Sequence, residues 1–191
     1  PYTGKSANLR ISAWNCGLSV SFLRNNNLRF VSEREFISED IYFYVELFSH
    51  LNKATIIEDV YYCYCQNEGS LTYSYKPDRF ARLKDFQIKI ENLADQLNYD
   101  GEVQLRLKES FIANTMGCLK MEVANCKKVG IRESYCRMKK ISSDGYLYQA
   151  VKAYPLDKYE RTWRFFAWGI TSKKNGLLYI GLLLKYITRG V

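Results

Sequence analysis

The pattern of hydrophobic and polar residues changes near residue 75 and divides the chain into two regions. Before this point, short apolar runs alternate between helical and β-branched character, with turn-forming residues between them. After it, apolar residues recur every three or four positions over long segments, which is the periodicity of amphipathic helices. The chain has only 3 prolines, so these helices can continue without interruption. The pattern predicts two domains, residues 1–75 and residues 76–191.

The first region is expected to contain two helices and a few short strands. An apolar stripe predicts a helix over about 19–26, which ends at a run of three asparagines. A second helix is expected over about 38–51. Ser38 is a suitable N-cap for it, and Glu39 and Asp40 complement the positive end of its dipole. Runs of β-branched and aromatic residues predict strands over 28–31, 54–57 and 60–65.

The second region is expected to be wholly helical. Its periodicity predicts helices over about 78–97, 102–126, 131–141, 159–168 and 177–187, with a turn at 142–145. No apolar run approaches the ~20 residues that a membrane-spanning helix needs. The expected fold class is therefore α+β and mostly helical, in which a few short strands precede a C-terminal helical region.

Charge is distributed unevenly between the two regions. The whole chain carries a net charge of +8. Residues 1–75 contain 6 basic and 8 acidic side chains, whereas residues 76–191 contain 22 and 12. This asymmetry points to an anionic partner, such as a membrane surface or an acidic protein, although a solvated lysine-rich helix surface has the same composition. The sequence contains no recognisable nucleic-acid-binding motif, so a nucleic-acid partner is not expected.

The cysteines indicate a reducing compartment. The chain has 6 cysteines and 1 histidine, His50, and no Cys-x-x-Cys pair, which leaves little for a zinc site. Cys63 and Cys65 would lie on one face of a strand and are expected to be buried. We expect free thiols and a cytoplasmic location. No secretory signal is visible. Because the first residues are polar and irregular and include no initiator methionine, we expect either a fragment or a trimmed chain.

Two clusters in the first region have the residue types that a sugar-handling site needs. Glu39 and Asp40 lie at a loop–helix junction, where a carboxylate can take a proton from a hydroxyl, although helix capping alone also accounts for them. Aromatic, amide and hydroxyl side chains then gather around the last predicted strand: Tyr61, Tyr62, Tyr64, Gln66, Asn67 and Ser70. Such a set suits recognition of a sugar or a base, and an ordinary edge strand and turn would look the same.

A third cluster lies at the C-terminus. Residues 157–191 interleave aromatic and aliphatic side chains with lysines and arginines, which fits helices in the interface of an anionic membrane on the inner face of the plasma membrane. A helical hairpin that packs on a core and has a basic outer face fits equally well. The chain contains no Gly-rich phosphate loop and no Asp-x-Asp pair. A Ser/His/Asp arrangement could be built only on His50, which is the single histidine.

With these residues in view, the region from Ser12 to about Ser74 resembles the later half of a family 2 glycosyltransferase of the GT-A type, as found in bacterial surface-polysaccharide synthesis. Four segments match in order. The first is Trp14-Asn15, which resembles a Trp-Asn-Lys opening with Cys16 in place of Lys. The second is Phe22-Leu23 with Asn27-Leu28-Arg29-Phe30, which resembles a short helix followed by an Ile-Arg-Phe phrase.

The other two segments surround the carboxylates and the aromatic cluster. The third, Ser38-Glu39-Asp40-Ile41-Tyr42-Phe43, resembles a Ser/Gly-Glu-Asp-aliphatic-x-Phe motif. The fourth, Val60 to Asn67 with Ser70-Leu71-Thr72, resembles a Tyr-x-Tyr-Arg phrase followed by polar residues, with Cys65 in place of Arg. Together the four segments cover about a third of the chain.

The resemblance implies a mechanism and a missing part. Asp40 would be the base that deprotonates the acceptor hydroxyl for an inverting displacement, and Glu39 would orient the acceptor or the backbone. The acceptor site would be lined by Trp14, Tyr64, Gln66, Asn67 and Ser70. The donor half, which binds a nucleotide sugar and a divalent metal, Mn or Mg, through an Asp-x-Asp motif, is absent. We therefore expect this chain to bind no cofactor and to be inactive alone.

The alternative is a protein of another class. The same chain could be a non-catalytic helical module that docks on an anionic membrane surface or on a partner protein. The basic second region favours this alternative, whereas the ordered motifs of the first region favour the transferase.

Overall fold

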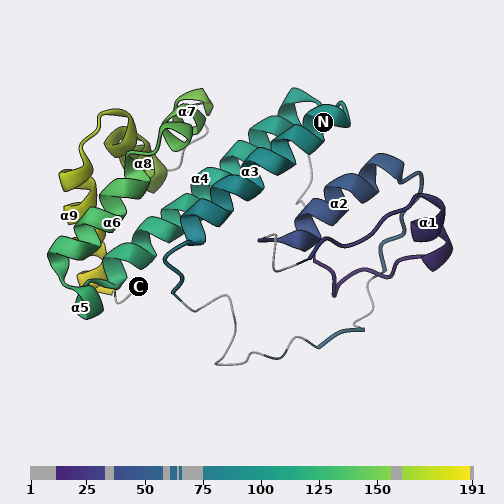
Figure 1. Cartoon of the computed structure of the whole chain (residues 1–191), viewed down its shortest axis with the longest axis horizontal. Coiled ribbons are helices and arrows are strands. Elements are labelled where there is room, and N and C mark those ends of the chain that lie inside the picture. The colour runs from purple at the N-terminus through teal and green to yellow at the C-terminus, as the bar shows by residue number, and fades with distance from the viewer. Residues whose placement is uncertain are drawn as a thin grey trace. The chain divides into compact units, whose positions relative to one another are not determined.

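The computed structural model of the chain describes residues 12–32, 37–57, 61–63, 65, 75–155 and 161–189 (Figure 1). Within these ranges all regular structure is helical, in the order α1 (Val20–Asn25), α2 (Glu39–His50), α3 (Arg79–Gln96), α4 (Gly101–Ala124), α5 (Cys126–Val129), α6 (Ile131–Ser142), α7 (Gly145–Ala153), α8 (Arg161–Thr171) and α9 (Asn175–Arg189). The chain divides into two compact units. The first unit comprises Pro1–Ser74 and Asn92–Asn98, and the second comprises Tyr75–Glu91 and Tyr99–Val191.

The first unit contains α1, α2 and a small apolar core. The helix expected over 19–26 is confirmed as α1, because Ser19 Oγ accepts a hydrogen bond from the Phe22 amide and Asn27 ends the turn with a left-handed φ of 53°. The core comprises four buried residues, Leu28, Phe43, Tyr44 and Leu47, with Leu18, Phe22, Leu23 and Leu51 packed against them. The residues just after α1 thus pack on the inner face of α2.

The strands expected in the first unit are absent from the described residues, so the α+β fold class is wrong and the described chain is mostly helical. Residues 28–31 and 54–57 form no ladder, and neither do the described residues of 60–65. A β-branched run becomes a strand only where neighbouring strands pair with it and a core covers one face. Here the Phe30 ring stacks on Phe43 of a helix instead, and Ile56 and Ile57 are exposed.

The same reason corrects the expectation for two cysteines. Cys63 and Cys65 are exposed, because no sheet provides a face to bury them. Cys118, which lies on α4, is buried instead. All 6 cysteines are free thiols in the structure.

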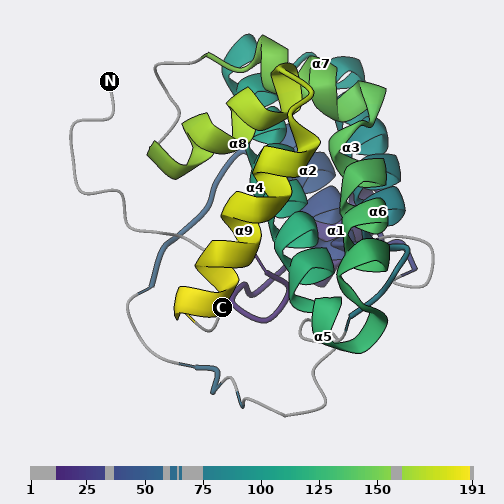
Figure 2. The same ribbon diagram turned by 90° about the vertical axis from the view of Figure 1, so that its left-hand side faces the viewer.

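The second unit is built around α4. Helices α6, α7 and α9 all contact α4, while α8 contacts α7 and α9. In Figure 2 the yellow helix α9 crosses in front of α4, with α8 and α6 on its two sides. The core draws on all of the longer helices, and its fully buried members include Ile112, Leu119, Met138, Leu147 and Leu178. Among the described residues, this core has seventeen buried members, against four in the core of the first unit.

The predicted helices of the second unit are confirmed with shifts of a few residues. Local signals set their ends: Asp100 Oδ1 accepts a hydrogen bond from the Val103 amide at 3.0 Å, and Asn98 has a left-handed φ of 55°. Gly130 separates α5 from α6 with a φ of 84°, which glycine adopts without strain. The sequence pattern predicts a turn at 142–145 and does not predict helix α7. Asp144 of that turn is the N-cap of α7, because its carboxylate accepts hydrogen bonds from the amides of Tyr146 and Leu147.

No helix in the described part of the chain is long and apolar enough to cross a membrane.

Candidate functional site

The two carboxylates singled out by the sequence occupy the first turn of α2. Glu39 and Asp40 are both partly exposed there. Ser38 is the N-cap by position, but it has a left-handed φ of 61° and its side chain makes no capping bond, so the expected serine cap is wrong. Asp40 Oδ1 instead accepts a hydrogen bond from the Ile41 amide at 2.9 Å. In the described residues neither carboxylate is part of an ion pair.

Tyr44 connects this turn to the segment around Trp14. One turn after Asp40, the Tyr44 hydroxyl donates to the Ser12 carbonyl at 3.4 Å. Burial raises the pKa of Tyr44 well above its ordinary value. The neighbouring Cys16 and the negative charge of Asp40 raise it further. Tyr44 therefore stays protonated at neutral pH. Asp40 and Cys16 are both close enough to act on it.

A pair of exposed aromatic rings lies in the same unit. The rings of Trp14 and Tyr62 are stacked, with centroids 5.3 Å apart and planes at 25°. Both side chains are partly exposed to solvent, Trp14 at 42% and Tyr62 at 53%. Exposed stacked rings can pack on the apolar face of a sugar ring, while nearby polar groups orient its hydroxyls.

Ring contacts join the four segments singled out in the sequence in pairs. Trp14 of the first segment meets Tyr62 of the fourth, and Cys16, next to the first, interacts with Tyr44, next to the third. Phe30 of the second segment stacks on Phe43 of the third, with centroids 3.9 Å apart. Segments up to 48 positions apart in sequence are thus neighbours in one small unit.

Four predicted site residues lie outside the described residues: Tyr64, Gln66, Asn67 and Ser70. Asn15 Oδ1 accepts hydrogen bonds from the Ser12 amide and the Cys16 thiol, which holds the turn next to Trp14. Within the described ranges, no group of His, Cys, Asp and Glu side chains is arranged to hold a metal ion.

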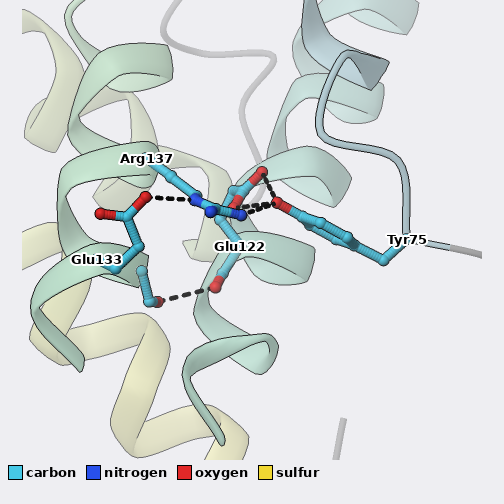
Figure 3. A network of polar contacts seen from close by, with 5 residues as sticks. Tyr75, Glu122, Glu133 and Arg137 are labelled. Carbon is cyan, nitrogen blue, oxygen red and sulfur yellow. Dashed lines mark hydrogen bonds and ion pairs between the residues drawn. The ribbon is translucent and has the colours of Figure 1, made fainter. Parts of the chain in front are cut away.

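The second unit contains a partly buried polar network around the buried Glu122, which sequence reasoning missed (Figure 3). The Tyr75 hydroxyl donates to the Glu122 carboxylate, with oxygens 2.9 and 3.1 Å away, and accepts from Arg137 Nη1 at 3.0 Å. Arg137 Nε also pairs with Glu133 at 2.8 Å, and Ser134 Oγ donates to the Glu122 carbonyl at 2.8 Å. The network therefore connects Tyr75, which lies upstream of α3, to helices α4 and α6.

The electrostatics of this network fit a structural role. Burial raises the pKa of Glu122, while the Tyr75 hydrogen bond and the Arg137 charge act against that shift. The groups satisfy one another, so the carboxylate is not presented to a ligand. One sequence signal could have found it: Glu122 is an acidic residue at a buried helical position between Leu119 and Val123.

Comparison with known proteins adds no relative. No family model matches this chain, and no curated protein or solved structure matches it either. The function is therefore argued from the chain's own residues and from the contacts among them.

Proposed function

We propose that the first unit is the acceptor side of an inverting glycosyltransferase of family 2. The enzyme transfers a sugar from a nucleotide sugar to a saccharide or lipid-linked acceptor in surface-polysaccharide synthesis. The observation that carries the proposal is that these segments pack against each other in pairs. Trp14 of the first segment stacks on Tyr62 of the fourth. Phe30 of the second stacks on Phe43 of the third. The proposal concerns these side chains and not the strands of a GT-A fold.

Asp40 is the base in this proposal. Its carboxylate takes the proton of the acceptor hydroxyl, whose oxygen attacks the anomeric carbon as the bond to the leaving diphosphate breaks. The start of α2 suits this role, because Asp40 is partly exposed and forms no ion pair with any described residue. Glu39, in the same turn, orients the acceptor.

The acceptor lies against Trp14, whose ring is stacked on Tyr62. Tyr64, Gln66, Asn67 and Ser70 belong to the same acceptor site in this proposal. The donor is bound elsewhere, because these 191 residues contain no Asp-x-Asp motif for a nucleotide sugar and its Mn or Mg ion. We assign donor binding to a preceding segment of a longer protein. Nucleotide sugars are cytoplasmic, so the site would face the cytoplasm.

The test compares the 191-residue chain with a protein extended by the coding sequence that precedes it. Both are incubated with a panel of nucleoside-diphosphate sugars, Mn or Mg, and a set of saccharide acceptors, and diphosphate release is measured. The extended protein is expected to turn over at least one donor, whereas the 191-residue chain shows none. Comparable activity in the short chain, or none in either protein, would contradict the proposal.

Trp14→Ala provides a test of the acceptor site in the extended protein. Loss of one stacking ring is expected to raise KM for a soluble acceptor by roughly two- to tenfold, with little change in kcat. Trp168→Ala is the matched control, because Trp168 is 43% exposed and Trp14 is 42% exposed. Equal effects of the two substitutions would remove Trp14 from the acceptor site.

A further inference from the structure

The last two helices expose large apolar side chains that the core does not use. Six of them are between 42% and 68% exposed: Phe165, Trp168, Leu177, Ile180, Leu184 and Ile187. Single exposed apolar residues are ordinary, but six on two consecutive helices are not. We call these six side chains the apolar face.

On α9 the apolar face is opposite the buried side. Leu178 and Tyr179 pack into the core, whereas Leu177, Ile180, Leu184 and Ile187 follow at intervals of three and four. That spacing aligns them along one stripe of the helix. The other exposed residues of α9 with described side chains are Gly176 and Thr188, so no charged residue interrupts the stripe.

The stripe continues onto α8. Gly181 of α9 lies directly under the Phe165 ring, because an added Cβ would lie only 2.8 Å from two of its ring carbons. Phe165 in turn contacts Trp168, with ring centroids 5.9 Å apart. Figure 2 shows α8 and α9 side by side. The six side chains therefore form one surface across both helices.

Positive charge surrounds this surface. Residues 161–189 contain six basic and no acidic side chains. Lys173 and Lys174 are exposed in the turn between the helices, at the Leu177 end of the stripe. Near the other end, Lys185 lines a shallow hollow with Lys120, Leu182 and Tyr186. The Lys127 ammonium lies 5.4 Å from the centre of the Tyr186 ring.

We propose that the apolar face docks on an anionic lipid membrane, with α8 and α9 lying in the plane of the interface. Aliphatic and aromatic side chains would enter the acyl boundary while the lysines at both ends meet lipid phosphates. Charge complementarity selects this occupant over a second copy of the chain, which would bring six more positive charges against the first six. The proposal does not depend on the transferase activity.

Vesicle co-sedimentation of the 191-residue chain tests this proposal. Vesicles of phosphatidylglycerol and phosphatidylcholine in equal parts are expected to bind the chain at low salt, and phosphatidylcholine alone is not. Leu184→Glu should weaken binding about tenfold or more, because a charge enters the apolar face. Ile88→Glu on α3 is the control: it adds the same charge at an exposed aliphatic side chain outside the apolar face and should bind like the unmodified chain.

A second variant tests the charges. Lys173→Asn combined with Lys174→Gln should weaken binding roughly tenfold at low salt. Asparagine is chosen at 173 because that residue has a left-handed φ of 55°. Equal binding to neutral vesicles, equal loss in Leu184→Glu and Ile88→Glu, or no binding at low salt would each overturn the proposal. A dimer that Leu184→Glu dissociates, without vesicle binding, would assign the face to a second copy.

Discussion

The two units differ in where their side chains are used. Among the described residues, the first unit buries a core of four and exposes the Trp14–Tyr62 pair. The described part of the second unit has seventeen buried core residues and a polar network that is satisfied internally. More of the described apolar burial therefore lies in the second unit, so we expect most of the measurable stability there. The side chains proposed for chemistry lie in the first unit.

The largest expected effect is on the core of the second unit. Leu119→Ala removes a fully buried side chain of α4 and should lower the free energy of unfolding by about 2–5 kcal/mol. Denaturant unfolding followed by far-UV circular dichroism measures this change. Leu47→Ala, the matched substitution in the first unit, should leave the main transition within about 0.5 kcal/mol of its original value. Equal losses would mean that the two units unfold as one.

Breaking the polar network should have a smaller effect. Tyr75→Phe removes the hydroxyl that donates to Glu122, which leaves a buried carboxylate short of a donor. We expect a loss of about 1–3 kcal/mol in the same unfolding experiment. Tyr148→Phe, on α7, removes a hydroxyl of the same kind outside this network and serves as the control. If the network does not contribute to stability, the two variants will have the same free energy of unfolding.

The pH dependence of stability should show the smallest effect. The pKa of Glu122 is raised above its ordinary 4.5, so the folded chain binds this proton more tightly than the unfolded chain. The resulting stability is fully present below pH 4.5 and is lost as pH rises through the raised value. Glu122→Gln cannot titrate and should therefore show a flatter profile of Tm against pH above 4.5. Parallel profiles would show that Glu122 titrates normally.

Local signals explain which parts of the fold could be predicted from the sequence. Helix periodicity and chain breakers act within a few residues, so the expected ends near Asn98 and Gly130 agree with the left-handed dihedrals found there. Strands depend on partners elsewhere in the chain, and the runs at 28–31 and 54–57 form no ladder with any described residue. The failure of the α+β prediction is therefore a failure to foresee non-local pairing.

The same limit applies to the sites. The acids of α2 are neighbours in the sequence. The Tyr75 hydroxyl, in contrast, bonds to Glu122, which is 47 positions away, and to Arg137, which is 62 positions away. No short motif contains them. The Trp14–Tyr62 stack joins segments equally far apart, and only their common resemblance to one family linked them in advance. The sequence alone does not show which leucines of α9 form the apolar face. In the structure Leu177 is exposed on this face, whereas Leu178 is buried in the core.

The kcat of the extended protein shows whether Asp40 is the base of a transfer reaction. Asp40→Asn should lower kcat about a hundred- to ten-thousand-fold, since that is the usual contribution of a general base. The Tm should stay unchanged, because Asp40 lies partly exposed on α2. Asp100→Asn, at the start of α4, is the control and should keep full activity. If Asp40→Asn kept its activity within about twofold of the original, against the loss expected of a base, the account would be contradicted.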